Sequence, residues 1–116
     1  MSDLTLYGIP NCDTVKKARR WLDEHGVAHR FHDFKKQGVP AERLDRWMAR
    51  VGWAKLVNRQ GTTWRKLAPE DQARVVDEAS ARAALLAQPS LIKRPVLEAG
   101  DRVLVGFDEA AYATLK

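Results

Sequence analysis

The stretch LTLYGIPNCDTVKKARRWL, residues 4–22, is the part of the chain from which the fold is predicted. Residues 4–7 favour a short strand, and the Gly8-Ile9-Pro10-Asn11 run predicts a turn. After Cys12, apolar side chains recur with the period of a helix whose opposite face is charged. The apolar positions are Val15, Ala18, Trp21 and Leu22. The stretch therefore predicts a strand, a turn and an amphipathic helix, with Cys12 at the junction.

The rest of the chain adds a second strand at 28–34, a loop at 35–38 and a helical insertion over approximately 40–88. The insertion is expected to contain a helix with Pro40 in its first turn and an apolar face of Leu44, Trp47, Met48 and Val51, a helical stretch over 69–79, and a helix over 81–87. The chain ends with strands at 96–98 and 102–105 around a Gly100-Asp101 turn, and with a helix at 109–115 that Asp108 caps.

This order of elements predicts an α/β fold. A crossover helix makes the first two strands parallel, whereas the tight Gly100-Asp101 turn makes the last two antiparallel. A four-stranded mixed sheet with helices on its faces satisfies both. We therefore predict a thioredoxin-like fold, βαβ followed by ββα with the helical insertion between the halves, in one domain over residues 1–116.

Composition narrows the class of protein. The chain has 116 residues, of which 45% are apolar, and a chain of this size buries roughly two-thirds of its surface on folding. No apolar run long enough for a membrane span or a signal segment occurs, so we expect a soluble cytoplasmic protein. The net charge of +5 is compatible with a nucleic acid, with an acidic thiol such as glutathione, or with a solvated basic surface.

Cys12 is the only cysteine, which excludes an internal disulfide and a multi-cysteine zinc site. The first N–H groups of a helix lack partners within it and the helix dipole is positive there, so a thiolate is favoured over a thiol. Lys16, one turn along, adds positive charge, whereas Asp13 opposes it if it turns toward the sulfur. The alternative is a small buried apolar side chain, but the strand–turn–helix setting favours a reactive cysteine.

The Lys93-Arg94-Pro95 segment precedes the third strand and, in the expected topology, faces the N-terminus of the first helix. An X-Pro bond at such a place is a candidate for the cis form, and Arg94 would present its planar charged group near the sulfur. The alternative is a pair of ordinary loop charges.

Other groups have plainer explanations. The histidines at 25, 29 and 32 lack the spacing of a metal site, and none is expected. Core packing is favoured over base stacking for the tryptophans at 21, 47, 53 and 64.

Four segments in order carry a resemblance to a known family: YGIPNCDTVKKA (7–18), NRQGTTWRKL (58–67), IKRPVL (92–97) and VGF (105–107). They resemble the ArsC/Spx family, arsenate-reductase-like proteins with a thioredoxin fold, with the YffB-type branch as the nearest match. The resemblance implies that Cys12 is the nucleophile, that Arg94 and, about one position offset, Arg59 hold the substrate oxyanion, and that Pro95 is the family's cis-proline. The expected substrate-binding set is Asn11, Lys16, Arg59 and Arg94.

Two departures from the family pattern limit the expected activity. Gly106-Phe107 stand where arsenate reductases carry a third arginine, so an oxyanion loses a charge-assisted contact and poor arsenate reduction is expected. Val15 stands where Spx-type proteins carry the second cysteine of a Cys-x-x-Cys switch.

We therefore expect a thiol-dependent reductase in which an outside thiol, glutathione or glutaredoxin, resolves the adduct on Cys12. Its substrate would be an oxidised thiol or an oxyanion, glutathione would be a co-substrate, no cofactor would be bound, and the chain would be a monomer. The alternative is a non-catalytic Spx-type regulator that binds RNA polymerase. Gly52 matches a glycine in the region where such regulators contact the polymerase.

Overall fold

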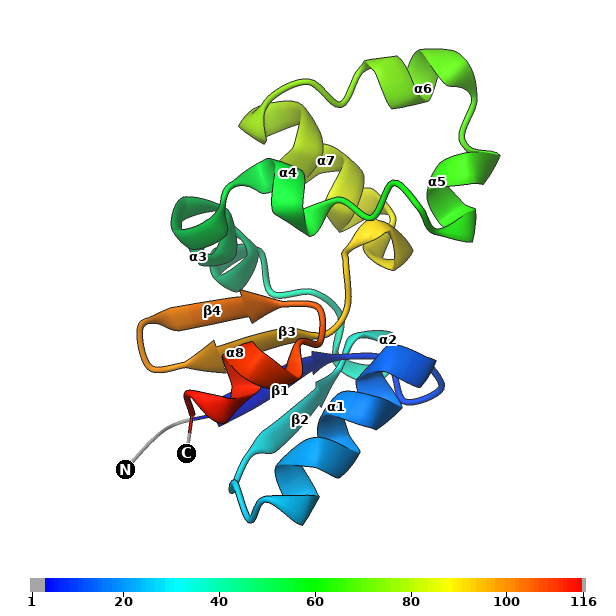
Figure 1. Cartoon of the computed structure of the whole chain (residues 1–116). Coiled ribbons are helices and arrows are strands. Elements are labelled where there is room, and N and C mark those ends of the chain that lie inside the picture. The colour runs from blue at the N-terminus through cyan, green and yellow to red at the C-terminus, as the bar shows by residue number, and fades with distance from the viewer. Residues whose placement is uncertain (1–3, 116) are drawn as a thin grey trace. The chain divides into compact units, whose positions relative to one another are not determined.

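The computed structural model describes residues 4–115 (Figure 1). The chain divides into two compact units: the described residues up to Gly38 together with those from Arg94 onward, and Val39–Lys93. The first unit contains the sheet, and the second is helical. The insertion expected over 40–88 lies inside the second unit, and the organisation as one domain stays a prediction.

A four-stranded mixed sheet with the order β2-β1-β3-β4 is the centre of the first unit. β1 (Leu4–Gly8) is parallel to β2 (Arg30–Asp33), and α1 (Asp13–Glu24) lies in the crossover between them. β1 is antiparallel to β3 (Val96–Ala99), which forms a hairpin with β4 (Arg102–Val105). The thioredoxin-like α/β fold predicted from the sequence is confirmed.

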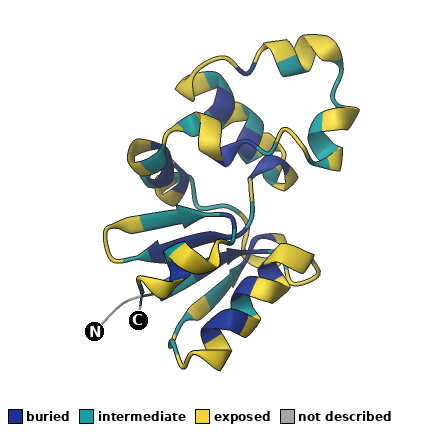
Figure 2. Cartoon of the chain, viewed as in Figure 1, coloured by how far each residue is buried: buried dark blue, intermediate teal, exposed yellow. Residues whose placement is uncertain are grey.

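The apolar face predicted for α1 packs into the core of this unit. The cluster contains Val15, Ala18, Trp21 and Leu22 of α1, Leu4 and Leu6 of β1, Leu97 of β3, and Tyr112 of α8 (Glu109–Ala113). Figure 2 shows β1, β3 and one side of α1 as buried. Full burial of a side chain of leucine size contributes about 1.5–3 kcal/mol, so the cluster fixes α1, and with it Cys12, against the sheet.

Three boundaries in the first unit differ from the sequence prediction. The second strand is confined to Arg30–Asp33, and the expected loop at 35–38 is mostly a helical turn, α2 (Phe34–Gln37). The Asp33 carboxylate starts this turn because it accepts a hydrogen bond from the Lys35 N–H at 2.8 Å. The last helix, capped by Asp108 as predicted, ends at Ala113.

The second unit consists of short helices. In chain order they are α3 (Ala41–Val51), α4 (Trp53–Leu56), α5 (Thr62–Lys66), α6 (Pro69–Ala73), α7 (Glu78–Ala87) and the 3-10 helix η1 (Pro89–Leu91). Leu44, Trp47 and Met48 of α3 are buried, as predicted, whereas Val51 is half-exposed. Pro40 is the N-cap of α3 and lies just before its first turn.

The continuous helical stretch predicted over 69–79 is wrong. α6 ends at Ala73, and Val76, predicted to lie on the apolar face, is 66% exposed. A capping box causes the break. The Asp77 carboxylate accepts a hydrogen bond from the Ser80 N–H at 2.9 Å, and Ser80 Oγ accepts one from the Asp77 N–H at 3.0 Å. These two bonds satisfy the first turn of a new helix, so α7 begins at Glu78.

Candidate active site around Cys12

Cys12 is the N-cap residue of α1 and is half-exposed. Its N–H donates to the Ile9 carbonyl at 3.3 Å, and its own carbonyl accepts the first helical hydrogen bond, from the Lys16 N–H at 2.9 Å. The Cys12 side chain makes no capping hydrogen bond to α1, so the N–H groups of the first turn lack a side-chain acceptor. Cys12 therefore stands at the positive end of a 12-residue helix.

The strand register brings the Arg94-Pro95 segment to the same end of the sheet. Tyr7 of β1 pairs with Val96 of β3, so continuing the antiparallel register by one residue puts Pro95 level with Gly8, where the turn before α1 begins. The Arg94–Pro95 peptide bond is cis, the form for which the sequence made it a candidate. Pro95 itself is buried.

The residues that follow β4 lie at the same end of the sheet as Pro95. The Gly106 N–H donates to the Pro95 carbonyl at 2.8 Å, and Gly106 has a φ of +79°, a conformation that favours glycine. Phe107 follows and packs against the core cluster of α1, as does Cys12. Gly106-Phe107, the pair that replaces an expected arginine, therefore belongs to this end of the sheet.

Three of the expected substrate-binding residues lie on these segments. Asn11 and Lys16 are exposed, and Arg94 is half-exposed. Within residues 4–115, none of the three side chains makes a hydrogen bond or an ion pair with the protein. Their polar groups are thus open to a ligand, and the expected approach of the Arg94 guanidinium to the Cys12 sulfur stays a prediction.

Arg59, the fourth, belongs to the second unit and lies in the loop between α4 and α5. Its guanidinium carbon is 5.8 Å from the Trp53 ring centroid and 5.6 Å from that of Trp64. Both tryptophans were expected to pack in the core, but both are half-exposed. This arrangement was not predicted from the sequence. A role for Arg59 in Cys12 chemistry stays a prediction.

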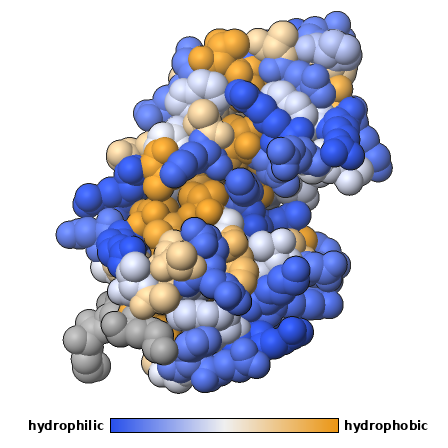
Figure 3. Space-filling model, in the orientation of Figure 1, coloured by the Kyte–Doolittle hydropathy of each residue, from blue (hydrophilic) through white to orange (hydrophobic). Residues whose placement is uncertain are grey.

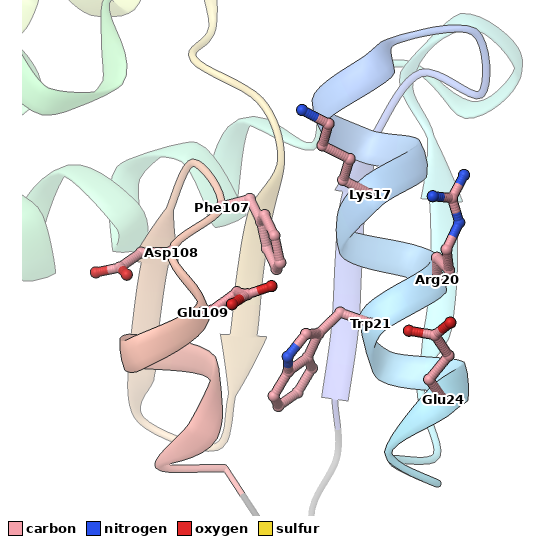
Figure 4. A pocket seen from close by; sticks show the side chains of 7 residues that line it. All are labelled: Lys17, Arg20, Trp21, Glu24, Phe107, Asp108 and Glu109. Atoms are coloured by element: carbon pink, nitrogen blue, oxygen red, sulfur yellow. The ribbon is translucent and has the colours of Figure 1, made fainter.

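A pocket of about 650 Å³ lies alongside α1 in the unit that contains Cys12 (Figure 4). It is lined by Lys17, Arg20, Trp21 and Glu24 of α1, and by Phe107, Asp108 and Glu109 at the start of α8. In Figure 4 the Trp21 and Phe107 side chains extend from the two walls into the space between them. This pocket was not predicted from the sequence, because its walls come from segments more than eighty residues apart.

An aromatic cluster supports the pocket. The Tyr112 ring meets Trp21 edge-on at 5.6 Å and Phe107 at 4.8 Å between centroids. Burial raises the pKa of the Tyr112 hydroxyl well above its usual value. Tyr112 is therefore neutral at physiological pH and supports the pocket by packing.

The three histidines contact backbone carbonyls. A ring nitrogen of His25, His29 and His32 lies 2.8, 2.9 and 2.8 Å, respectively, from the carbonyl oxygen of Trp21, Val27 and Gly38. Over residues 4–115, no three His, Cys, Asp or Glu side chains are grouped to hold a metal ion. In the same part of the chain, no helix has the length and apolar character needed to cross a bilayer.

The sheet order and a cysteine at the start of α1 define a thioredoxin-like protein with one candidate nucleophile. The model of the ArsC family matches residues 7–115, and the chain belongs to that family. A solved structure described as arsenate reductase from Vibrio cholerae, 18% identical, shares the fold with a TM-score of 0.73, and the match covers 88% of this chain and 87% of that one.

Individual relatives agree with this assignment. An uncharacterized protein of Haemophilus influenzae is 41% identical over 109 residues, which are 94% of this chain and 95% of that protein. A solved structure described as YFFB (PA3664) protein is 58% identical, superimposes with a TM-score of 0.91, and the match covers 96% of each chain. The global transcriptional regulator Spx of Streptococcus agalactiae is more distant, 29% identical over 91% of this chain and 77% of its own.

Proposed function

We propose that this ArsC-family chain is a cytoplasmic thiol-dependent reductase in which Cys12 is the nucleophile. The observation that carries the proposal is the position of the chain's one cysteine, half-exposed at the N-terminus of α1. The unpartnered N–H groups and the positive end of the helix favour a negative charge on the sulfur. A cysteine that served only as a small apolar side chain of the core would not require a half-exposed position at a helix N-terminus.

The proposed reaction is a pair of thiol–disulfide exchanges. The Cys12 thiolate attacks the glutathionyl sulfur of a mixed disulfide, forms a Cys12–glutathione disulfide and releases the substrate as a thiolate, which takes up a proton. Because the chain has no second cysteine, the thiolate of a second glutathione, or of a glutaredoxin, then attacks the glutathionyl sulfur. Glutathione disulfide, or its glutaredoxin counterpart, leaves, and the Cys12 thiolate is regenerated. The outside thiol thus supplies the second sulfur of the disulfide that leaves.

Polar and basic side chains near Cys12 support an anionic partner. Asn11, Lys16 and Arg94 lie at the same end of the sheet or on the first turn of α1, without protein partners in the described residues. Glutathione carries two carboxylates, which an arginine binds through its planar fork. Gly106-Phe107 offer no third guanidinium, so we expect a tetrahedral oxyanion such as arsenate to be a poor substrate.

A turnover assay tests the proposal. The full chain is supplied with glutathione, glutathione reductase and NADPH, and with the mixed disulfide of glutathione and a small thiol. NADPH oxidation is expected to depend on the chain and to be lost in Cys12→Ser, which differs by one atom. Equal rates with the two chains, or no rate above the blank, would contradict the proposal.

A second candidate is a regulator that binds RNA polymerase. The observation in its favour is the similarity to the Spx regulator over 91% of this chain. Val15 in place of a second cysteine removes the thiol switch, so such a regulator would act without one. Retention of polymerase by a chain with alkylated Cys12 would support this candidate, and absence of retention would remove it.

A further inference from the structure

The pocket beside α1 is a feature of the first unit that the proposed function does not use. Its volume of about 650 Å³ lies within the usual size of small-molecule sites, roughly 300–1,000 Å³. Its lining combines two aromatic rings, those of Trp21 and Phe107, with charged groups of both signs. Both walls belong to the unit that contains the sheet, so one compact part of the chain defines the pocket.

The Trp21 indole carries a hydrogen-bond donor that the protein does not use. Only 7% of Trp21 is exposed, and within residues 4–115 its ring N–H has no acceptor. In the same part of the chain, no side-chain nitrogen or oxygen that is sealed from solvent lacks a partner, so this N–H reaches an accessible surface. In Figure 4 the ring nitrogen is on the edge of the indole that faces α8. A nearly buried indole usually donates to an acceptor, so this donor points to an acceptor on a ligand.

Opposite charges on the two walls do not neutralise each other. Lys17 of α1 and Glu109 of α8 are exposed and line the pocket, and in the described chain neither side chain has a hydrogen bond or an ion pair. The Glu109 carboxylate extends toward α1 in Figure 4, and the surface over α1 is mostly hydrophilic in Figure 3. Exposed charges are usually only solvated, and the unused indole donor beside them is what distinguishes this place.

We propose that the pocket binds a small zwitterion of the α-amino acid class with an apolar side chain. The carboxylate of the ligand accepts hydrogen bonds from the Trp21 N–H and the Lys17 ammonium, and its ammonium donates to the Glu109 carboxylate. Its apolar side chain packs against the ring of Phe107, which is half-exposed. The site uses no atom of Cys12 and does not rest on the proposed reductase activity.

A ligand with a single charge fits the same lining less well. An anion would leave Glu109 uncompensated, and a cation would meet Lys17 and Arg20. The Asp108 carboxylate is already used, because it accepts a hydrogen bond from the Ala110 N–H at 3.1 Å. Among the described residues of the α8 wall, Glu109 is therefore the acidic side chain that is open to a ligand.

The test uses the unmodified full chain and four probes without sulfur. The amino acid phenylalanine carries both charges and a ring, 2-phenylethylamine lacks the carboxylate, 3-phenylpropanoate lacks the ammonium, and alanine lacks the ring. Binding is followed by the Trp21 indole N–H signal in NMR spectra, identified as the indole signal missing from Trp21→Phe. Phenylalanine is expected to shift this signal saturably with a dissociation constant on the order of 1 mM, and each other probe to bind about fivefold more weakly or less.

Single substitutions separate the contacts from the fold. Glu109→Gln and Lys17→Gln change exposed side chains, and each is expected to weaken phenylalanine binding about fivefold. Lys36→Gln, exposed and outside the pocket, removes the same charge as Lys17→Gln and is expected to leave the affinity unchanged. Trp21→Phe keeps a ring but loses the donor, and binding followed by backbone amide signals is expected to weaken about tenfold. The two surface variants keep the test decisive if Trp21→Phe does not fold.

Three results would overturn the inference. They are no saturable shift of the Trp21 signal up to about 10 mM phenylalanine, binding of any other probe as tight as that of phenylalanine, or unchanged affinity in both Glu109→Gln and Lys17→Gln. Because none of the probes reacts with a thiol, the result is independent of whether Cys12 supports turnover.

Discussion

Replacing Arg94 by alanine is expected to slow formation of the Cys12–glutathione disulfide about fivefold, a change that corresponds to about 1 kcal/mol. When the antiparallel register of β1 and β3 is continued beyond the two strands, Arg94 falls opposite Ile9, and neighbouring strands are about 5 Å apart. The Ile9 carbonyl accepts a hydrogen bond from the Cys12 N–H. A unit charge on the order of 8 Å from the sulfur contributes about 0.5 kcal/mol in water and about 2 kcal/mol where solvent is partly excluded. Since Arg94 is half-exposed, the contribution of its charge is expected to lie between these two limits, at about 1 kcal/mol.

Arg94→Lys separates charge from shape. Lysine keeps the positive charge but loses the planar fork, so the rate at saturating glutathione disulfide should approach that of the unchanged chain while the concentration needed for half-saturation rises. Rates are measured by quenching with acid and counting modified chains by mass spectrometry. Urea unfolding of each variant is expected to show a free-energy change within about 0.5 kcal/mol, because the side chain is half-exposed.

The matched control is Arg30→Ala. Arg30 is exposed and pairs with Thr5, toward the other end of the sheet, and its loss changes the net charge by the same amount. Slowing in Arg94→Ala with none in Arg30→Ala supports a local effect. An unchanged rate in Arg94→Ala, or equal slowing in both variants, would refute the reasoning and remove Arg94 from the site.

Three further predictions concern the fold that positions the site. Burial raises the pKa of the Tyr112 hydroxyl, so folded Tyr112 stays neutral above about pH 10, where the tyrosines of the unfolded chain ionise. The free energy of unfolding should therefore fall by about 1.4 kcal/mol per pH unit above that pH. Tyr112→Phe should lose that slope in urea titrations from pH 8 to 11, and an identical slope would contradict the assignment. Hydrogen bonds from Ser80 lower the pKa of Asp77. The contribution of Asp77 to the free energy of unfolding is therefore fully present above the pKa of the unfolded carboxyl and is lost as the pH falls through the folded pKa. Asp77→Asn, which keeps an acceptor, should flatten the acid side of the stability profile, and equal acid sensitivity would count against the capping box. Leu97→Ala, which truncates a fully buried side chain of the core cluster, should destabilise the chain by about 2–5 kcal/mol in urea unfolding. A loss below about 1 kcal/mol would show that the cluster is not the core.

Local patterns were sufficient to predict the sheet half of the fold. The strand–turn–helix around Cys12 follows from side-chain period and turn residues, and the Gly100-Asp101 turn dictates the hairpin. Chain order then left one simple sheet, which the structure confirms. The segment over 69–79 was wrong because its apolar spacing suited a helix, whereas the side-chain hydrogen bonds of Asp77 with Ser80 decided the local structure.

The candidate site was predictable only in part. Cys12 and the Arg94-Pro95 segment could be found because strand order and family resemblance both point to them. The tryptophans beside Arg59 were missed, since an apolar ring at a helical position is usually core and nothing in the spacing shows that it faces a cation. The pocket beside α1 was missed because it depends on the tertiary approach of Phe107 to Trp21.

The most direct test of the central claim is a single-turnover measurement by intact mass spectrometry. The full chain is mixed with glutathione disulfide, and reduced glutathione is added afterwards. The proposal predicts that each chain gains one glutathionyl group, that the group maps to Cys12, and that reduced glutathione removes it to regenerate the original mass. A chain that stays unmodified, or an adduct that reduced glutathione does not release, would contradict the claim that Cys12 is the nucleophile of a thiol-dependent reductase.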